Sequence, residues 1–185
     1  MDICNVTTDK NELIRSLNHD DAYRVLMTLL REKPNLEGEI YKIATQILND
    51  VDADEIMGDV YFELDMLDVE DLYDRSGKTR YGYVEPSEES WAMIEEAIAP
   101  FIDEMKKCQG IRRLPNMAKI YCAGIIKGLR EFGKESNSEI LEWAQDALED
   151  FVENVFDEWK KGHPSDEDIA EISQISNNPD SADES

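Results

Sequence analysis

The 185-residue sequence contains few of the signals that mark β-strands. Runs of β-branched residues with a two-residue period are missing, and neither Asn-Gly nor Asp-Gly occurs, so the usual hairpin signals are absent. Prolines and glycines instead separate segments whose apolar residues recur at helical spacing. The sequence therefore predicts an all-α protein of seven or eight helices in antiparallel hairpins, forming a bundle or a short helical-repeat-like solenoid.

Long apolar segments are also missing. No run approaches the roughly 20 residues that span a bilayer, and the first residues lack the basic and apolar regions of a signal peptide. We therefore expect a cytoplasmic protein with no membrane partner. Its 43 acidic residues outnumber 19 basic ones, and the net charge of −24 disfavours direct binding to nucleic acid while favouring a partner with a basic surface.

Histidine and cysteine are too sparse for the common catalytic and metal motifs. The three cysteines, Cys4, Cys108 and Cys122, lie far apart and are expected to be buried or inert thiols. Neither His19 nor His163 completes the Glu-x-x-His pair of di-iron bundles. No G-x-S-x-G or P-loop motif occurs. We therefore expect a non-enzymatic protein with no catalytic residue, cofactor or metal.

The most acidic stretch begins like a calcium-binding loop. Asp50, Asp52 and Asp54 have the spacing of the first three ligands, but Glu55 replaces the required glycine and Tyr61 replaces the final glutamate. The preferred interpretation is a helix cap followed by a helix whose acids face water.

The helical periodicity predicts both the helices and their subdomains. Helices are expected over 9–17, 20–33, 36–50, 52–67, 86–108, 115–133 and 136–162, with a further turn of helix near 69–74 and a weak helix over 165–176. The long loop between the fifth and sixth helices suggests the following division: an N-terminal helical subdomain (1–75), a linker loop (76–86), C-terminal helical hairpins (87–176) and a disordered tail (177–185).

Three local features refine these helices. Small residues on 115–133 should allow another helix to approach closely. Ser136 and Glu139 have the spacing of a capping box at the start of 136–162, and Gly162 suits the position just after its end. Apolar stripes on every helix, including those on 20–33 and 36–50, are expected to be buried by neighbouring helices.

The charge is distributed unevenly along the chain. Residues 106–134 hold eight bases and one acid, whereas 50–105 hold 18 acids and three bases, and 135–185 hold 16 acids and two bases. One interpretation is a central helix whose bases pair with acids on its neighbours, and another is a bipolar surface for a charged partner.

The sequence therefore suggests a protein–protein interaction module, with two alternatives. One is a nucleic-acid mimic that inhibits a DNA- or RNA-binding protein. The other is a metal-dependent enzyme of phosphate chemistry that uses clustered carboxylates such as Glu88 and Glu89. A groove near Trp91 and Tyr121 is a further possible contact site. The expected partner-binding residues are Asp59, Glu63, Arg112, Arg113, Glu142, Asp146, Glu149 and Glu153.

The stretch "NELIRSLNHDDAYRVLMTLLREKPNLEGEIYKIA" resembles the helical regions that accompany SWIM-type zinc fingers in bacterial and archaeal proteins. Those regions have a Leu-rich helix pair, a Pro-x-Leu break and a third helix, followed by acidic hairpins. The likeness extends over residues 9–161, but the zinc finger with its Cys and His ligands is absent. The resemblance implies a helical-repeat-like domain with a role in protein interaction, and it transfers no metal or nucleic-acid site to this chain.

Overall fold

The structure is a computed structural model that describes residues 4–48, 51–80, 82–144 and 147–177. It confirms the all-α fold, with ten α-helices in the described residues rather than seven or eight. The chain divides into two compact units, residues 1–49 (unit 1) and residues 50–185 (unit 2). We describe each unit separately.

Unit 1 consists of three amphipathic α-helices and one turn of 3₁₀-helix. Asn18 caps the second helix, because its side chain accepts a hydrogen bond from the Asp21 backbone N–H. Pro34 ends that helix and begins the 3₁₀ turn, which contacts the helices on either side. The elements of unit 1 are α1 (Cys4–Arg15), α2 (His19–Glu32), η1 (Pro34–Leu36) and α3 (Glu37–Leu48).

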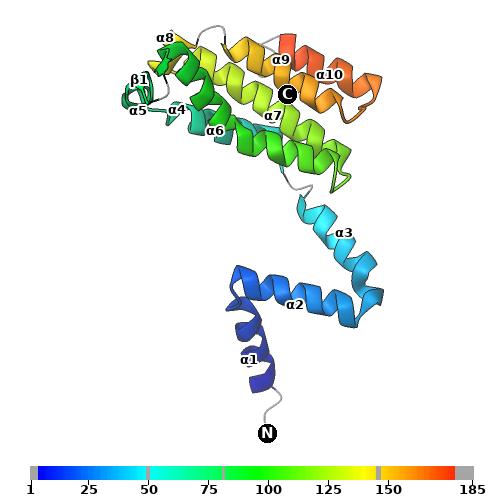
Figure 1. Ribbon diagram of the computed structural model, residues 1–185. Helices are drawn as coiled ribbons and strands as arrows, with labels where there is room; N and C mark the ends of the chain where they lie inside the picture. The colour runs from blue at the N-terminus through cyan, green and yellow to red at the C-terminus, as the bar shows by residue number, and fades with distance from the viewer. Residues whose placement is uncertain (1–3, 49–50, 81, 145–146, 178–185) are drawn as a thin grey trace. The chain divides into compact units, whose positions relative to one another are not determined.

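Unit 2 is a helical bundle built around one long central helix (Figure 1). Its helices are α4 (Ala53–Asp65), α5 (Val69–Arg75), α6 (Pro86–Gln109), α7 (Pro115–Glu135), α8 (Ile140–Trp143), α9 (Ala147–Lys160) and α10 (Asp166–Asn177). Helix α7 contacts α4, α6, α9 and α10, and ten of its residues are buried. The core of unit 2 is therefore arranged around α7.

The closest helix packing in unit 2 joins α7 to α4. A Cβ atom added at Gly124 would lie 2.6 Å from the Ile56 Cβ, and one added at Gly128 would lie 2.7 Å from the Val60 Cβ. The backbones approach so closely that only glycine fits at these two positions. This confirms the expectation that the small residues of the 115–133 segment admit a neighbouring helix.

The position of the division differs from the expected one. We placed the first boundary in the loop 76–86, but the units divide at residues 49 and 50. Helices α4 and α5 belong to unit 2, where α4 packs against α6 and α7 and α5 packs against α6. The buried ridge Ile56, Val60 and Leu64 on α4 explains this placement, because it fits against the glycines of α7.

The expected linker loop contains a small antiparallel hairpin. Strand β1 (Gly77–Thr79) pairs with β2 (Gly82–Val84), with Gly77 opposite Val84 and Lys78 opposite Tyr83. Gly77 and Gly82 have φ angles of +83° and +143°, which L-residues with side chains rarely adopt. These glycines give the loop its hairpin geometry, although it lacks the usual Asn-Gly signal.

The single helix expected over 136–162 is divided. It forms α8 and α9, and the Ser136–Glu139 capping box does not form. The Ser136 hydroxyl accepts a hydrogen bond from the Ser138 N–H and donates one to the Asp65 carboxylate. At the far end, His163 rather than Gly162 has a positive φ, of 54°. Of the expected tail (177–185), Asn177 is the last residue of α10, and residues 178–185 lie outside the described part of the chain.

Candidate interaction surfaces

The basic helix α7 is neutralised largely by its own neighbours. The Lys127 ammonium lies 2.7 Å from the Asp54 carboxylate of α4, and the Lys119 ammonium lies 2.8 Å from both Asp168 and Glu171 of α10. In the described part of the chain, seven of the eight bases between 106 and 134 form ion pairs. On α7 itself, three of the four bases pair with acids on α4, α9 and α10, and Lys134 pairs with Glu135 of the same helix, which matches the interpretation of a central helix paired with acids on its neighbours.

Arg130 links three helices of unit 2. Its guanidinium on α7 donates two hydrogen bonds to the Glu149 carboxylate on α9 and one of 2.7 Å to the Ser176 carbonyl on α10. A bidentate arginine–carboxylate pair fixes orientation as well as adding energy. Glu149, one of the expected partner contacts, therefore has a role in the packing of helices.

The remaining expected contact residues are distributed over three helices and the loop before α7. Asp59 and Glu63 are exposed on α4, whereas Glu142 is exposed on α8 and Glu153 on α9. Asp146 lies outside the described residues. Arg112 is half-buried and pairs with Glu104 at 2.7 Å, while Arg113 is exposed with a φ of 53°.

The expected helix cap at Asp52, the aromatic Trp91 and two of the cysteines are also placed by the structure. Asp52 caps α4, since its side chain accepts a hydrogen bond from the Asp54 N–H. Trp91 is half-buried, with its ring centroid 5.4 Å from that of Phe151. Cys108 and Cys122 are buried, and burial raises the pKa of the Cys122 thiol.

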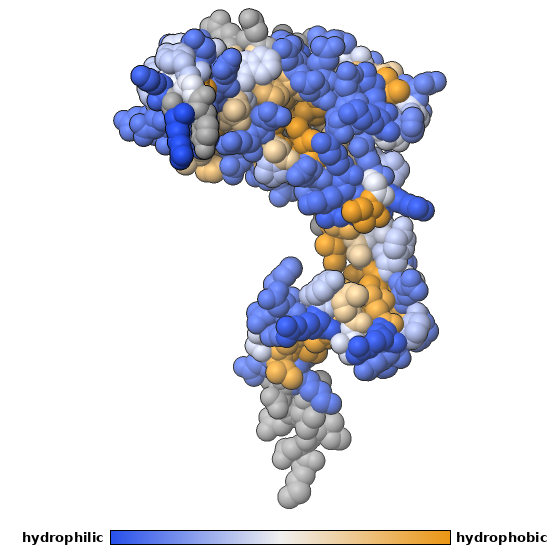
Figure 2. Space-filling view, in the orientation of Figure 1, coloured by the Kyte–Doolittle hydropathy of each residue, from blue (hydrophilic) through white to orange (hydrophobic). Residues whose placement is uncertain are grey.

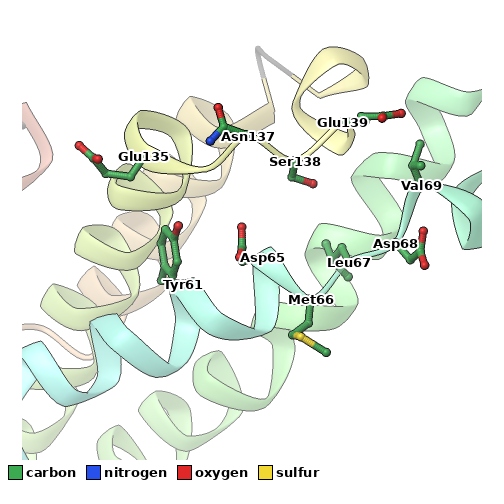
Figure 3. A pocket seen from close by; sticks show the side chains of 10 residues that line it. All are labelled: Tyr61, Asp65, Met66, Leu67, Asp68, Val69, Glu135, Asn137, Ser138 and Glu139. Atoms are coloured by element: carbon green, nitrogen blue, oxygen red, sulfur yellow. The ribbon is translucent and has the colours of Figure 1, made fainter.

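A pocket that the sequence did not suggest lies where α4 and α7 end (Figure 3). Its volume is about 550 Å³, and Tyr61 and Asp65 project from α4 toward the segment that carries Asn137 and Ser138. Burial, together with the negative charges of Asp65, Glu131 and Glu135, raises the pKa of the Tyr61 phenol. Four carboxylates and no base line this pocket: Asp65, Asp68, Glu135 and Glu139.

The carboxylates of the described residues do not gather into a metal site. No group of three or more His, Cys, Asp or Glu side chains converges there in a way that could hold a metal ion. Likewise, none of the described helices has the combination of length and apolar character that crossing a membrane requires.

The described part of unit 1 has no buried core and exposes many large apolar side chains. No described side chain between residues 10 and 48 is buried, although the sequence predicts apolar stripes on α2 and α3. On the face shown in Figure 2, hydrophobic side chains are exposed along the helices of unit 1. Among the described residues, ten of the sixteen large exposed hydrophobic side chains belong to this unit: Leu13, Ile14, Tyr23, Val25, Leu26, Met27, Leu29, Tyr41, Ile43 and Ile47.

The expectation that every apolar stripe is buried is therefore wrong for unit 1. Unit 2 largely follows the expected pattern. Of the stripe predicted over 136–162, Leu148 is half-buried and the other five residues are buried: Ile140, Ala144, Phe151, Val155 and Trp159. Within unit 1, α2 and α3 each contact η1, and none of the described side chains on their apolar faces is buried. Amphipathic periodicity thus predicts which face is apolar, but it does not reveal whether the same chain covers that face.

The ion pairs of unit 2 predict a specific pH dependence. Hydrogen bonds from Lys107 and Arg112 lower the pKa of the Glu104 carboxyl, so this group releases its proton more readily in the folded protein. Its stabilising effect is therefore present above the ordinary glutamate pKa and is lost as the pH falls through the lower folded value. We expect Glu104→Gln to cost about 1 kcal/mol at pH 7 and almost nothing near pH 2.

Urea unfolding of the wild type and of Glu104→Gln at several pH values measures this difference. Glu153→Gln, which changes an exposed carboxylate on α9, is the matched control and should track the wild type at every pH. A Glu104→Gln deficit that stays constant from pH 7 to 2 would contradict the assigned role of the charge.

No family model, curated protein or solved structure gives a significant match to this chain.

Proposed function

We propose that the protein is a non-enzymatic protein–protein interaction module whose contact surface is the apolar face of unit 1. The observation that carries this proposal is the complete absence of buried side chains among described residues 10–48, beside a fully formed core in unit 2. In this proposal unit 2 is a stably folded acidic domain, and unit 1 carries the side chains that contact the partner.

The energetics of unit 1 support a partner. Helices α1, α2 and α3 have 12, 14 and 12 residues, and isolated helices of about this length are only marginally stable in water. Burying one large apolar side chain contributes about 1.5–3 kcal/mol. A partner that covers several of these side chains would therefore supply the stabilisation that unit 1 does not obtain from its own packing.

The proposal moves the expected contact away from the acidic faces. Glu149 and Arg112, two of the expected contact residues, are engaged within unit 2 by Arg130 and Glu104. The apolar side chains of α2 have no comparable role in a core. A soluble protein rarely exposes so many large apolar side chains together unless they form a contact site.

Two variants of α2 test the proposal. Leu26 is central to the apolar face, whereas Thr28 lies on the polar side of the same helix. We expect Leu26→Asp to reduce binding of the partner by roughly tenfold or more, since a charge enters an apolar contact, while Thr28→Asp leaves binding unchanged.

The measurement is quantitative co-purification of partner proteins with the tagged full-length chain, at low and at high salt. An apolar contact should resist the high-salt wash, because salt screens only the electrostatic contribution. Equal capture by both variants, or complete release by salt, would assign the contact to the acidic surfaces of unit 2 instead.

A further inference from the structure

We infer that the face of α7 beneath α10 is a docking site for an acidic amphipathic helix, and that α10 closes this site in the free protein by occupying it. The inference concerns unit 2 alone, so it goes beyond the contact proposed for unit 1. It follows from how α10 is attached, from the face of α7 on which it lies, and from the charges that meet there.

Few apolar contacts attach α10 to unit 2. The helix lies along α7 and α9 (Figure 1), and Ile172 is the one buried residue among its twelve. The neighbouring helix α9 buries five of its 14 residues. Because apolar burial is the main force that holds a helix on a bundle, α10 should separate from unit 2 more readily than α9 does.

Polar contacts hold both ends of α10. Near its start, the Lys119 ammonium lies 2.8 Å from the carboxylates of Asp168 and Glu171. At its end, the Arg130 guanidinium donates a hydrogen bond of 2.7 Å to the Ser176 carbonyl. The Glu171 side chain is 57% exposed, so water and salt weaken its ion pair. These contacts therefore set the position of α10 without holding it firmly.

The face of α7 beneath α10 has an apolar centre between two cationic donors. Lys119 and Arg130 are eleven residues apart, or about three turns, so they lie on the same face of α7. Cys122, Ala123 and Ile126 share that face by their spacing, and all three are buried. We call these five residues the α10 seat. Separation of α10 would leave the seat without the helix that now lies on it.

The sequence of α10 defines the kind of helix that fits the seat. It carries four acids and no base, and Asp168, Ile172 and Ile175 have the spacing of one helical face. Lys119 selects carboxylates near the start of such a helix. Arg130 already pairs with Glu149 of α9, so it offers α10 a donor for a carbonyl of the last turn.

A helix with the same pattern in a partner protein would compete with α10 for the seat. Each separation of α10 makes the seat available, and a partner binds in proportion to the open fraction. Unit 2 is strongly acidic, with 35 acids and 13 bases over residues 50–185, so it repels acidic ligands at long range. Only a helix that also fills the apolar centre is therefore expected to bind.

A peptide copy of α10 tests the site on the full-length chain. The probe is a synthetic peptide of residues 164–177, which includes the Ser165 hydroxyl that accepts a hydrogen bond from the Asp168 N–H. Ile172→Ser in the receptor removes the buried side chain of its own α10, so the open fraction rises. We expect this variant to bind the probe roughly tenfold or more tightly than the wild type does.

The matched control is Gln174→Ser, which introduces the same residue at an exposed position of α10 and should bind the probe as weakly as the wild type. Two-dimensional NMR of the ¹⁵N-labelled chain at physiological salt follows the amides of residues 119–130. This method measures dissociation constants up to about 1 mM, the range expected of one short helix.

Charge reversal tests the chemistry of the site. A probe with both Asp168→Lys and Glu171→Lys should bind the Ile172→Ser chain roughly tenfold more weakly, because like charges meet at Lys119. Adding Lys119→Glu to that receptor should reverse the preference between the two probes, since opposite charges then meet again.

Hydrogen exchange of the wild type tests the separation of α10 independently. The hydrogen-bonded amides of α10 should exchange together, roughly tenfold or more faster than those at the centre of α7. Exchange of α10 only together with α7 would overturn the inference, as would loss of protection in α7 on Ile172→Ser, because α10 would then be a permanent part of the core. Failure of the probe to bind a folded Ile172→Ser chain, or equal binding of both probes, would exclude the docking site.

Discussion

Phe132→Ala should lower the free energy of unfolding by about 4 kcal/mol, because truncation leaves a large cavity in a closely packed core. Phe132 is fully buried on α7, and its ring packs edge-on against Tyr61 with the centroids 6.4 Å apart. Denaturant unfolding followed by circular dichroism measures the loss. For unit 2 this change is a large fraction of the typical stability of a domain.

A phenylalanine in the same bundle provides the control for that variant. Phe62 on α4 is 60% exposed, so Phe62→Ala should change the unfolding free energy by no more than about 0.5 kcal/mol. Comparable losses from Phe62→Ala and Phe132→Ala would contradict the assignment of the core.

Replacing both Gly124 and Gly128 with alanine should lower the unfolding free energy of unit 2 by about 4 kcal/mol. Each new methyl group would lie within 2.9 Å of a backbone carbonyl of α4, the Ala53 oxygen in one case and the Met57 oxygen in the other. Backbone atoms cannot rotate away as a flexible side chain can, so the two helices must separate. The intrinsic gain of about 1 kcal/mol per glycine-to-alanine change in a helix offsets only part of this cost.

Gly58 is the matched control, since it is an exposed glycine inside α4 with no atom within 4 Å of an added Cβ. Gly58→Ala should therefore stabilise the protein by up to about 1 kcal/mol. The opposite signs at Gly58 and at the α7 glycines separate helix propensity from interhelical contact. If Gly124→Ala and Gly128→Ala also stabilise the protein in thermal unfolding, α4 does not pack where the structure places it.

The sequence predicted local features of the helices well. The predicted ridge on 52–67 is buried at Ile56, Val60 and Leu64 and half-buried at Leu67. Pro86 and Pro115 begin α6 and α7 as expected. These features depend on a few neighbouring residues, because backbone geometry sets both the helical period and the position at which proline is tolerated.

Local predictions failed where a side chain bonds to a segment that is distant in the sequence. The spacing of Ser136 and Glu139 suits a capping box, but the Ser136 hydroxyl instead bonds to Asp65 at the end of α4. This carboxylate is 71 residues away in the chain, so no local pattern could reveal it. The pocket beside Asp65 was missed for the same reason, since the ends of α4 and α7 come together only in the folded unit.

The sequence by itself determined that the protein is helical, which face of each helix is apolar, and that a basic segment lies between acidic ones. Tertiary structure decided that Lys119, Lys127 and Arg130 pair with acids on three different helices, and that α4 packs with unit 2. It also decided that the apolar faces of α2 and α3 remain uncovered in unit 1. Periodicity records only that a face avoids water, whereas the surface that covers it depends on contacts between distant segments or between molecules.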